Sequence, residues 1–333
     1  IRMVSIKHLK FVSVCAIALT AAVFGSSNTA HAEYPTKPVT LVSPYGAGGA
    51  ADLAARILGN TAVDLLGQSI VVVNKTGGAG VIGSMSVVTA APDGYTLLLS
   101  RVGSQAAVPA MNKRTPYTWD QYTFLGLLEL NPFALTVNAD SPYKTFADLE
   151  KAIKGGASLS YSSAGVGALQ HLGVVVMLDQ MKVDPAQLKH VPYKGGGAAG
   201  AAVIGGHVDI FFQNLSGVIG HMNGGKLRAL AVSTDERSPS APDVPTFKEL
   251  GYPGMNVILG WSGLWGPPNL PKDVTAKWID VLAKLKTDKK WIEATEKLGS
   301  VPYILPPAET KAFVKKQYDV FETVSEKLGL TIK

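Results

Sequence analysis

Short apolar runs alternate with longer amphipathic stretches along most of the chain. Residues 39–43, 70–74 and 96–100 are rich in Val, Leu and Ile and are followed by Gly, Pro or polar residues, which predicts buried strands. Residues 52–66 and 145–154 have the apolar spacing of helices, and Thr145 with Asp148 approximates a capping box. Because strands and helices alternate, we predict an α/β fold with mainly parallel sheets.

A second set of elements follows in the middle of the chain. Strands are predicted at residues 159–162, 190–192, 209–213 and 227–232, and the final helices at 272–328. The extended apolar segments 122–138 and 257–264 are candidate crossings between two domains. We therefore expect a discontinuous first domain, residues 33–131 plus 260–333, and a second domain, residues 132–259.

The first residues have the pattern of a secretion signal. Arg2, Lys7 and Lys10 precede an apolar run, 11–24, and Ala30-His31-Ala32 resembles a cleavage site. We expect residues 1–32 to be a removed signal peptide, which places the mature protein in the periplasm; the alternative is a retained membrane anchor. The single cysteine lies within this segment, so no disulfide is expected in the mature protein.

Composition and charge favour a globular protein and argue against nucleic-acid binding. With 47% hydrophobic and 17% charged residues, the chain can bury a sizeable core. The net charge is +6, and the predicted signal holds three basic residues and no acidic ones, which leaves 6 − 3 = +3 for the mature protein. The lysines are scattered, with a local concentration only in the C-terminal helices, so the sequence offers no clustered basic face for nucleic acid.

The most informative segment is the glycine loop after the first predicted strand, residues 43–52. Glycine lets a backbone approach a ligand closely, and the first N–H groups of a helix lack intrahelical partners. Those donors and the helix dipole together form a binding site for an anion, and this site needs no charged side chain. We assign Gly48, Gly49 and Ala50 as donors to a carboxylate, with Asp52 holding the loop. The alternative is that these glycines serve packing alone.

Three further strand ends carry glycine and hydroxyl residues: 101–104, 162–167 and 193–197. Ligands of open α/β sheets bind beyond the carboxyl ends of the strands, so these loops predict a cleft with two loops from each half. The candidate ligand-binding residues are Tyr45, Gly46, Gly48, Gly49, Ala50, Arg101, Ser104, Ser163, Gly165, Tyr193 and Gly195.

Individual residues of this set allow two interpretations. Arg101 either pairs with a carboxylate or is a surface arginine at a strand end. Tyr45 either contacts the ligand or covers the cleft. His171 is interpreted as a core or capping residue, so it is placed with Asp52 and Asp209 among structural residues near the site.

No motif indicates catalysis, a cofactor or a metal. Gly78, Gly80 and Gly83 match a dinucleotide fingerprint, but no acidic residue stands at the end of the next strand, so a structural turn is the better interpretation. The histidines after the signal lack metal-ligand spacing, and no nucleophile with an adjacent base is evident. We expect a non-enzymatic protein without cofactor or metal.

An ordered series of short motifs resembles the periplasmic receptors of tripartite tricarboxylate transporters, the Bug family. The series covers essentially the whole chain after the signal. Its segments include Pro92-Asp93-Gly94-Tyr95-Thr96-Leu97, His190-Val191-Pro192-Tyr193-Lys194-Gly195, Gly206-His207-Val208-Asp209 and Gly225-Lys226-Leu227-Arg228-Ala229-Leu230.

The resemblance implies two α/β domains with mixed sheets and crossing strands that close over a ligand like a flytrap. It also implies capture of a small organic carboxylate (a di- or tricarboxylate or an aromatic acid) by a monomer that delivers it to two membrane subunits. The sequence departs from the family where the first glycine loop has Gly46-Ala47 in place of two prolines. A periplasmic sensor that feeds a signalling kinase is the alternative function.

Overall fold

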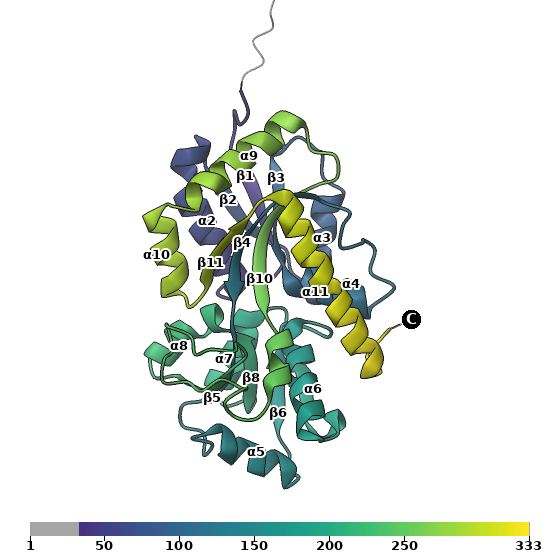
Figure 1. Cartoon of the computed structure of the whole chain (residues 1–333), viewed down its shortest axis with the longest axis vertical. Helices are drawn as coiled ribbons and strands as arrows, with labels where there is room; N and C mark the ends of the chain where they lie inside the picture. The colour runs from purple at the N-terminus through teal and green to yellow at the C-terminus, as the bar shows by residue number, and fades with distance from the viewer. Residues whose placement is uncertain (1–32, 333) are drawn as a thin grey trace, which may run out of the picture. The chain divides into compact units, whose positions relative to one another are not determined.

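The computed structural model describes residues 33–332, so the predicted signal peptide lies outside the described residues. Two sheets organise this part of the chain (Figure 1). The first has six strands in the order β11-β4-β10-β3-β1-β2. Its strands are β1 (Val39–Ser43), β2 (Ile70–Asn74), β3 (Thr96–Arg101), β4 (Thr123–Asn131), β10 (Gly260–Gly266) and β11 (Val301–Leu305).

The second sheet has five strands in the order β7-β6-β8-β5-β9. All five come from the middle of the chain, between two strands of the first sheet. They are β5 (Phe133–Asn138), β6 (Ser160–Ser163), β7 (Lys189–Pro192), β8 (Ile210–Asn214) and β9 (Leu227–Val232).

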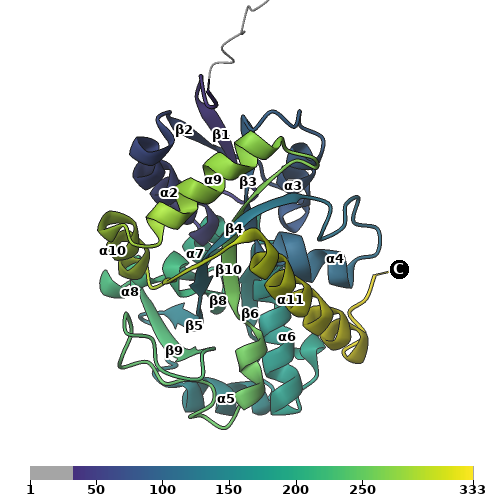
Figure 2. The same cartoon turned by 45° about the horizontal axis from the view of Figure 1, so that its top comes forward.

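Helices pack on both sheets, as Figures 1 and 2 show from two sides. Around the first sheet lie α2 (Ala50–Leu66), α3 (Val81–Val88), the π-helical turn η3 (Gly103–Ala107), α4 (Val108–Met111), α9 (Lys272–Leu285), α10 (Lys289–Lys297) and α11 (Pro307–Lys327). Around the second lie α5 (Phe146–Lys154), α6 (Leu169–Met181), α7 (Gly196–Ile204), the short turn η5 (Leu215–Gly217) and α8 (Ile219–Asn223).

The burial of alternate residues explains why the first sheet is covered on both faces. Leu97 and Leu99 belong to one apolar cluster with Trp278 of α9, whereas Leu98 belongs to another with Phe321 of α11. Successive side chains of a strand point to opposite faces, so an uninterrupted apolar strand requires a helix on each side.

The chain passes between the sheets twice. The first passage is at Pro132, which separates β4 from β5, and the second lies between the end of β9 and the start of β10. The first sheet therefore takes strands from both sides of the second sheet's segment. The domain boundaries remain a prediction.

The two-sheet α/β fold with mixed sheets is confirmed, but the expectation of mainly parallel sheets is wrong. Strand β10 is antiparallel to β3 and β4, and β5 is antiparallel to β8 and β9. The passages between the sheets account for β10 and β5, because a strand that enters from the other sheet runs against its neighbours. Strand β11 is also antiparallel to β4 but does not enter from the other sheet. Strand β11 and the helical turns of residues 103–111 were not anticipated from the sequence.

Close packing explains the glycine motif at residues 78–83. A Cβ on Gly83 would lie 2.6 Å from the Lys75 carbonyl oxygen and 2.7 Å from the Pro44 Cα, both backbone atoms. Helix α3 can approach the ends of β1 and β2 so closely only because this position lacks a side chain. Gly83 of this motif thus serves packing of α3 against the ends of β1 and β2.

We expect Gly83→Ala to lower the free energy of unfolding by about 1–3 kcal/mol, because the added methyl overpacks a rigid contact. Gly220→Ala is the matched control: it lies in helix α8 with no atom within 4 Å of the added Cβ. The control should be neutral or stabilising by up to about 1 kcal/mol, since Ala is the better helix former. Urea unfolding of both variants measures the difference; equal stability would contradict the packing argument.

Candidate functional site

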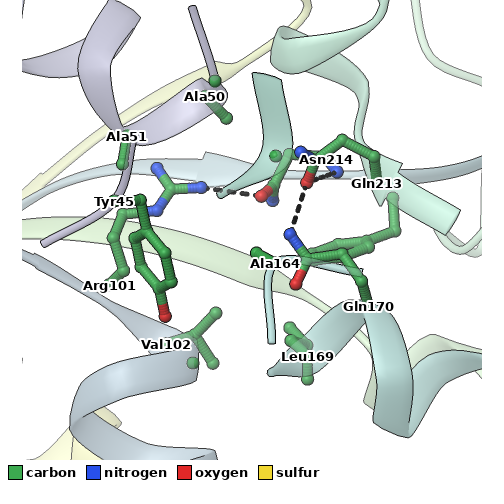
Figure 3. A pocket seen from close by; sticks show the side chains of 14 residues that line it. Tyr45, Ala50, Ala51, Arg101, Val102, Ala164, Leu169, Gln170, Gln213 and Asn214 are labelled. Carbon is green, nitrogen blue, oxygen red and sulfur yellow. Dashed lines mark hydrogen bonds between the residues drawn. The ribbon is translucent and has the colours of Figure 1, made fainter. Parts of the chain in front are cut away.

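A small cavity lies where loops from the two sheets meet (Figure 3). Its volume is about 30 Å³. One wall comes from the first sheet and its connections: Tyr45, Gly49, Ala50, Ala51, Arg101, Val102 and Gly103. The other comes from the second sheet and its connections: Phe133, Ala164, Leu169, Gln170, Gly196, Gln213 and Asn214.

The N-terminus of helix α2 supplies backbone donors to this cavity. Gly49 is the N-cap residue, and the first intrahelical bond runs from the Leu53 N–H to the Gly49 carbonyl at 3.0 Å. The N–H groups of Ala50 and Ala51 precede that bond and so have no carbonyl of the same helix to meet. The cavity thus contains two backbone donors at the positive end of a helix dipole.

Asp52 shapes the loop before this helix. Its carboxylate accepts hydrogen bonds from the Gly48 N–H at 3.1 Å and the Asn74 amide at 3.0 Å, and it pairs with Arg56 at 3.0 Å. Burial acts to raise the pKa of Asp52, but the bonds from Arg56, Gly48 and Asn74 outweigh it and hold that pKa below its usual value. The Gly48 N–H is therefore committed to Asp52.

Arg101 is buried at the cavity, with 4% of its surface exposed. Strands β3, β10 and β4 place Arg101, Ser262 and Glu129 side by side in register. The guanidinium Nη1 donates to the Ser262 hydroxyl and lies 3.5 Å from the Glu129 carboxylate, which also accepts from Ser262 at 2.6 Å. Burial lowers the pKa of Arg101, and Glu129 opposes that shift. These contacts exclude the surface-arginine interpretation.

The other end of the guanidinium joins the two sheets. Nη2 of Arg101 donates to the Asn214 side-chain oxygen at 2.8 Å, and Figure 3 shows this bond crossing the cavity. Gln213 accepts from Gln170 at 2.9 Å beside it. The Asn214 Nδ2 is buried and has no partner among the described residues. The second sheet therefore presents uncharged amides to the cavity, one of them with an unpaired donor.

Tyr45 covers one side of the cavity with its ring, which Figure 3 shows beside Arg101. Its hydroxyl donates to the Ala79 carbonyl at 2.9 Å. Burial raises the pKa of Tyr45 to about 12, so it is a neutral donor at physiological pH. With its hydroxyl committed, Tyr45 offers the cavity an aromatic surface.

Glycine loops of the two sheets meet backbone to backbone beside the cavity. A Cβ on Gly195 would lie 2.6 Å from the Gly46 nitrogen, and one on Gly49 would lie 3.2 Å from the Gly197 nitrogen. Larger residues at these positions would hold the loops apart. The glycines after strands β1 and β7 thus permit close contact between the two halves.

The structure brings only some of the predicted residues to the cavity. Tyr45, Gly49, Ala50 and Arg101 line it, whereas the lining does not include Gly46, Gly48, Ser104, Ser163, Gly165, Tyr193 or Gly195.

The residues outside the lining have other contacts. Ser104 is buried and donates to Gln105, and Ser163 bonds to His190 at 2.6 Å. Gly165 lies against Ala79, and Tyr193 packs on an apolar cluster of the second sheet. Asp209 binds Ser160 at the opposite end of β8 from the cavity.

Sequence reasoning missed the amides Gln170, Gln213 and Asn214. A signal for two of them exists: Gln213 and Asn214 stand at the carboxyl end of a predicted strand, where ligands of α/β sheets bind. Their register opposite Arg101 depends on how the two sheets face each other, which the sequence does not reveal.

Two histidines stack beside the predicted loop at residues 162–167. The rings of His171 and His190 lie 4.2 Å apart at an interplanar angle of 9°, and Tyr161 stacks on His190 at 4.8 Å. The Gly167 N–H donates to the His171 Nδ1 at 3.1 Å. Burial lowers the pKa of both histidines, and with the neighbouring His171 it lowers that of His190 to about 4.

Comparison with known proteins identifies the family. Residues 54–330 match the sequence profile described as "Tripartite tricarboxylate transporter family receptor". The chain belongs to this family. Protein BugT of Bordetella pertussis is 30% identical over 303 residues, which cover 90% of this chain and 92% of BugT. Family members of this type are substrate-binding receptors of the periplasm, and this protein is a receptor and not an enzyme.

Two solved structures with ligands resemble the described fold. MatC from Rhodopseudomonas palustris, solved with bound malate, is 28% identical with a TM-score of 0.81 and covers 87% of this chain and 99% of its own. A second R. palustris protein, solved with adipate, is 25% identical with a TM-score of 0.85 and covers 90% of this chain and 100% of its own.

Residues 33–332 offer neither a metal site nor a membrane-spanning helix. No group of His, Cys, Asp or Glu in this range is arranged to hold a metal ion. None of the helices in the same range is long and apolar enough to cross a membrane.

The histidine stack should make the receptor sensitive to acid. Because folded His171 and His190 have pKa values below that of an unfolded histidine, about 6.5, the unfolded state binds protons first as the pH falls. The free energy of unfolding should therefore decrease between about pH 6.5 and pH 4. In urea unfolding across this range, His190→Gln should flatten the decrease relative to the unsubstituted protein; identical slopes for the two proteins would refute the assignment.

Proposed function

We propose that this receptor captures a small organic dicarboxylate between its two sheets in the periplasm and delivers it to the two membrane subunits of a tripartite tricarboxylate-type transporter. One observation supports this most directly: the N-terminus of α2 and the guanidinium of Arg101 line the same cavity. Malate and adipate, the ligands in the two solved relatives, each have two carboxylates.

Each carboxylate has a distinct place in this proposal. The first binds the N–H groups of Ala50 and Ala51, where the helix dipole favours negative charge. The second binds Arg101 together with the unpaired Nδ2 of Asn214, because charge-assisted bonds to a guanidinium are among the strongest in proteins. The rings of Tyr45 and Phe133 contact the carbon chain between the two carboxylates.

The size of the cavity implies movement. Ligand pockets usually have volumes of about 300–1,000 Å³, and this cavity has about 30 Å³. A dicarboxylate therefore enters only if the sheets separate at the passages near Pro132 and between β9 and β10. We propose that residues 33–131 with 260–333 move as one domain and residues 132–259 as the other, and that ligand contact with both favours closure.

Binding of adipate and malate tests the proposal directly. In isothermal titration calorimetry against a series of mono-, di- and tricarboxylates, at least one dicarboxylate should bind more tightly than its monoamide. Small-angle scattering should show a smaller radius of gyration when it saturates the protein. If no carboxylate of the series binds, the proposed substrate class is wrong.

The Arg101–Glu129 pair allows a charge-matched test. Glu129→Gln leaves the Arg101 charge unbalanced, so dicarboxylate affinity should rise while stability falls by roughly 3 kcal/mol, the scale of a broken buried pair. Adding Arg101→Ala to that variant should weaken dicarboxylate binding by about 1.5–3 kcal/mol relative to Glu129→Gln alone, the value of a hydrogen bond to a charged group. Monocarboxylates should lose less. Equal affinities in all three proteins would remove Arg101 from the site.

Gly49 tests the contact between the loops. The backbone of Gly49 is extended (φ −90°), so Gly49→Val causes no backbone strain, but its side chain would enter the space held by Gly196 and Gly197. We expect dicarboxylate affinity to fall at least about tenfold, equivalent to 1.4 kcal/mol, and scattering to show a larger radius of gyration. Gly46→Ala is the control, since its Cβ would meet its nearest neighbour at an ordinary 3.7 Å. Wild-type affinity in Gly49→Val would place the anion elsewhere.

A further inference from the structure

A second cavity, distinct from the first, lies between α3, α4, α6 and the last described residues of the chain. Its volume is about 320 Å³, which falls within the range of about 300–1,000 Å³ typical of small-molecule pockets. Figures 1 and 2 both place α4, α6 and the end of the chain close to one another. None of its lining residues lines the first cavity.

The walls of the second cavity come from both halves of the protein. Val81, Val108 and Met111 belong to elements of the first sheet, and Val166 and Leu172 belong to the loop and helix after β6. The halves touch there, since a Cβ on Gly167 would lie 3.5 Å from the Met111 Cε. A molecule in this cavity would contact both halves at once.

The C-terminal segment closes another side. Ile332 donates its N–H to the Met111 carbonyl at 2.7 Å and accepts from the Lys113 N–H at 3.0 Å. This pairing holds the side chains of Leu330 and Ile332 against the cavity. Val166 and Ile332 remain 59% and 43% exposed, so apolar surface continues to the solvent at the rim.

The charges around the cavity indicate what it can hold. Arg114 carries the permanent charge among the lining residues. It is exposed and forms no ion pair with a described residue. The lining includes no acidic residue. His171 turns toward this cavity with its Nδ1 accepting from Gly167. A single cation beside an apolar chamber complements a molecule with an apolar body and one negative group.

We propose that the second cavity binds an apolar monocarboxylate, with the hydrocarbon among Val108, Met111 and Leu172 and the carboxylate at Arg114. A dicarboxylate has no second partner there and would bury an unpaired charge. The remaining lining is apolar enough for a short acyl chain. The site therefore takes a different chemical class from the dicarboxylate site proposed above.

Occupation of the second cavity should also act on the first. Because its walls come from both halves, a bound monocarboxylate favours the arrangement in which the halves are in contact. That arrangement is the one proposed to hold a dicarboxylate, so the two ligands should enhance each other's binding reciprocally. This coupling rests on the proposed function, whereas binding in the second cavity does not.

Methyl NMR of the protein labelled with carbon-13 at methionine tests occupancy, with octanoate as the probe. The methyl of Met111, assigned through Met111→Leu, should shift with saturable dependence on octanoate. Met222 on helix α8 lies outside the cavity and should not shift. Octanol, equal in chain length and uncharged, should bind at least tenfold more weakly. No shift at Met111, or equal binding of octanol, would overturn the proposal.

Two variants locate the carboxylate and the chain. Arg114→Gln should weaken octanoate binding at least fivefold, while Lys248→Gln, which removes an exposed charge elsewhere, should not. Leu172→Trp should fill the chamber and abolish the shift. If Leu172→Trp does not fold, Arg114→Gln decides alone, because Arg114 is exposed and its removal leaves the core unchanged. Undiminished octanoate affinity in Arg114→Gln would overturn the assignment.

Calorimetry separates the two proposals. With octanoate saturating, the affinity for the tightest dicarboxylate should rise about fivefold or more, the lower end of typical coupling. If octanoate competes with the dicarboxylate, the second cavity is not a separate site. If octanoate binds and shifts Met111 while no dicarboxylate binds at all, the proposed function fails and the second site stands.

Discussion

Burial of the Arg101 guanidinium is the constraint on which the arrangement of the site depends. A charge removed from water is costly unless it is paired and hydrogen-bonded, so each face of this guanidinium must meet a partner. Glu129 and Ser262 meet it from neighbouring strands of the first sheet, and Asn214 meets it from the second. The bond to Asn214 exists only while the two sheets are close. Separation of the sheets would return that part of the guanidinium to water.

The glycine loops make this approach possible. Gly49 and Gly195 lie where any Cβ would press on backbone of the opposite loop, and backbone atoms cannot move aside as flexible side chains do. Small residues therefore set the minimum distance between the halves, and Arg101 supplies a polar contact at that distance. In the proposed closed state the donors of α2 gain as well, because exclusion of water strengthens an electrostatic contact.

The sequence predicted those features that depend on local patterns. Strand and helix order, the capping box of Thr145 and the loop at residues 43–52 follow from short-range periodicity and turn residues, and the structure contains them. Helix α2 begins at Ala50, two residues before the predicted start at Asp52, because Gly49 takes the cap position and Asp52 holds the loop from the third helical residue. Family motifs then indicated a two-sheet receptor.

Features that depend on long-range register could not be predicted. The sequence indicates Arg101 as a candidate but not its partner Glu129, which lies on β4. Strand β10 lies between β3 and β4 in the sheet, and it follows β4 by more than 100 residues along the chain. The hydroxyls of Ser104 and Ser163 were assigned from loop composition, and composition does not tell which way a side chain turns. The structure directs them to Gln105 and His190.

The balance of charge in the first cavity bears on release as well as capture. A receptor that hands its ligand to a membrane partner must also let it go, so a lone buried cation would be a disadvantage. Because Glu129 stays beside Arg101, the pair is close to neutral as a whole. In the proposed site the contact of Arg101 with a carboxylate therefore acts together with helix N–H groups and amides held in fixed positions, and not as a lone charge. Dipoles fixed on the two sheets can contact the ligand together only while the sheets are close. An unpaired charge would attract the ligand in either state. In the proposed mechanism, recognition by a balanced ion pair and fixed dipoles couples affinity to closure, so that opening of the two halves would release the ligand.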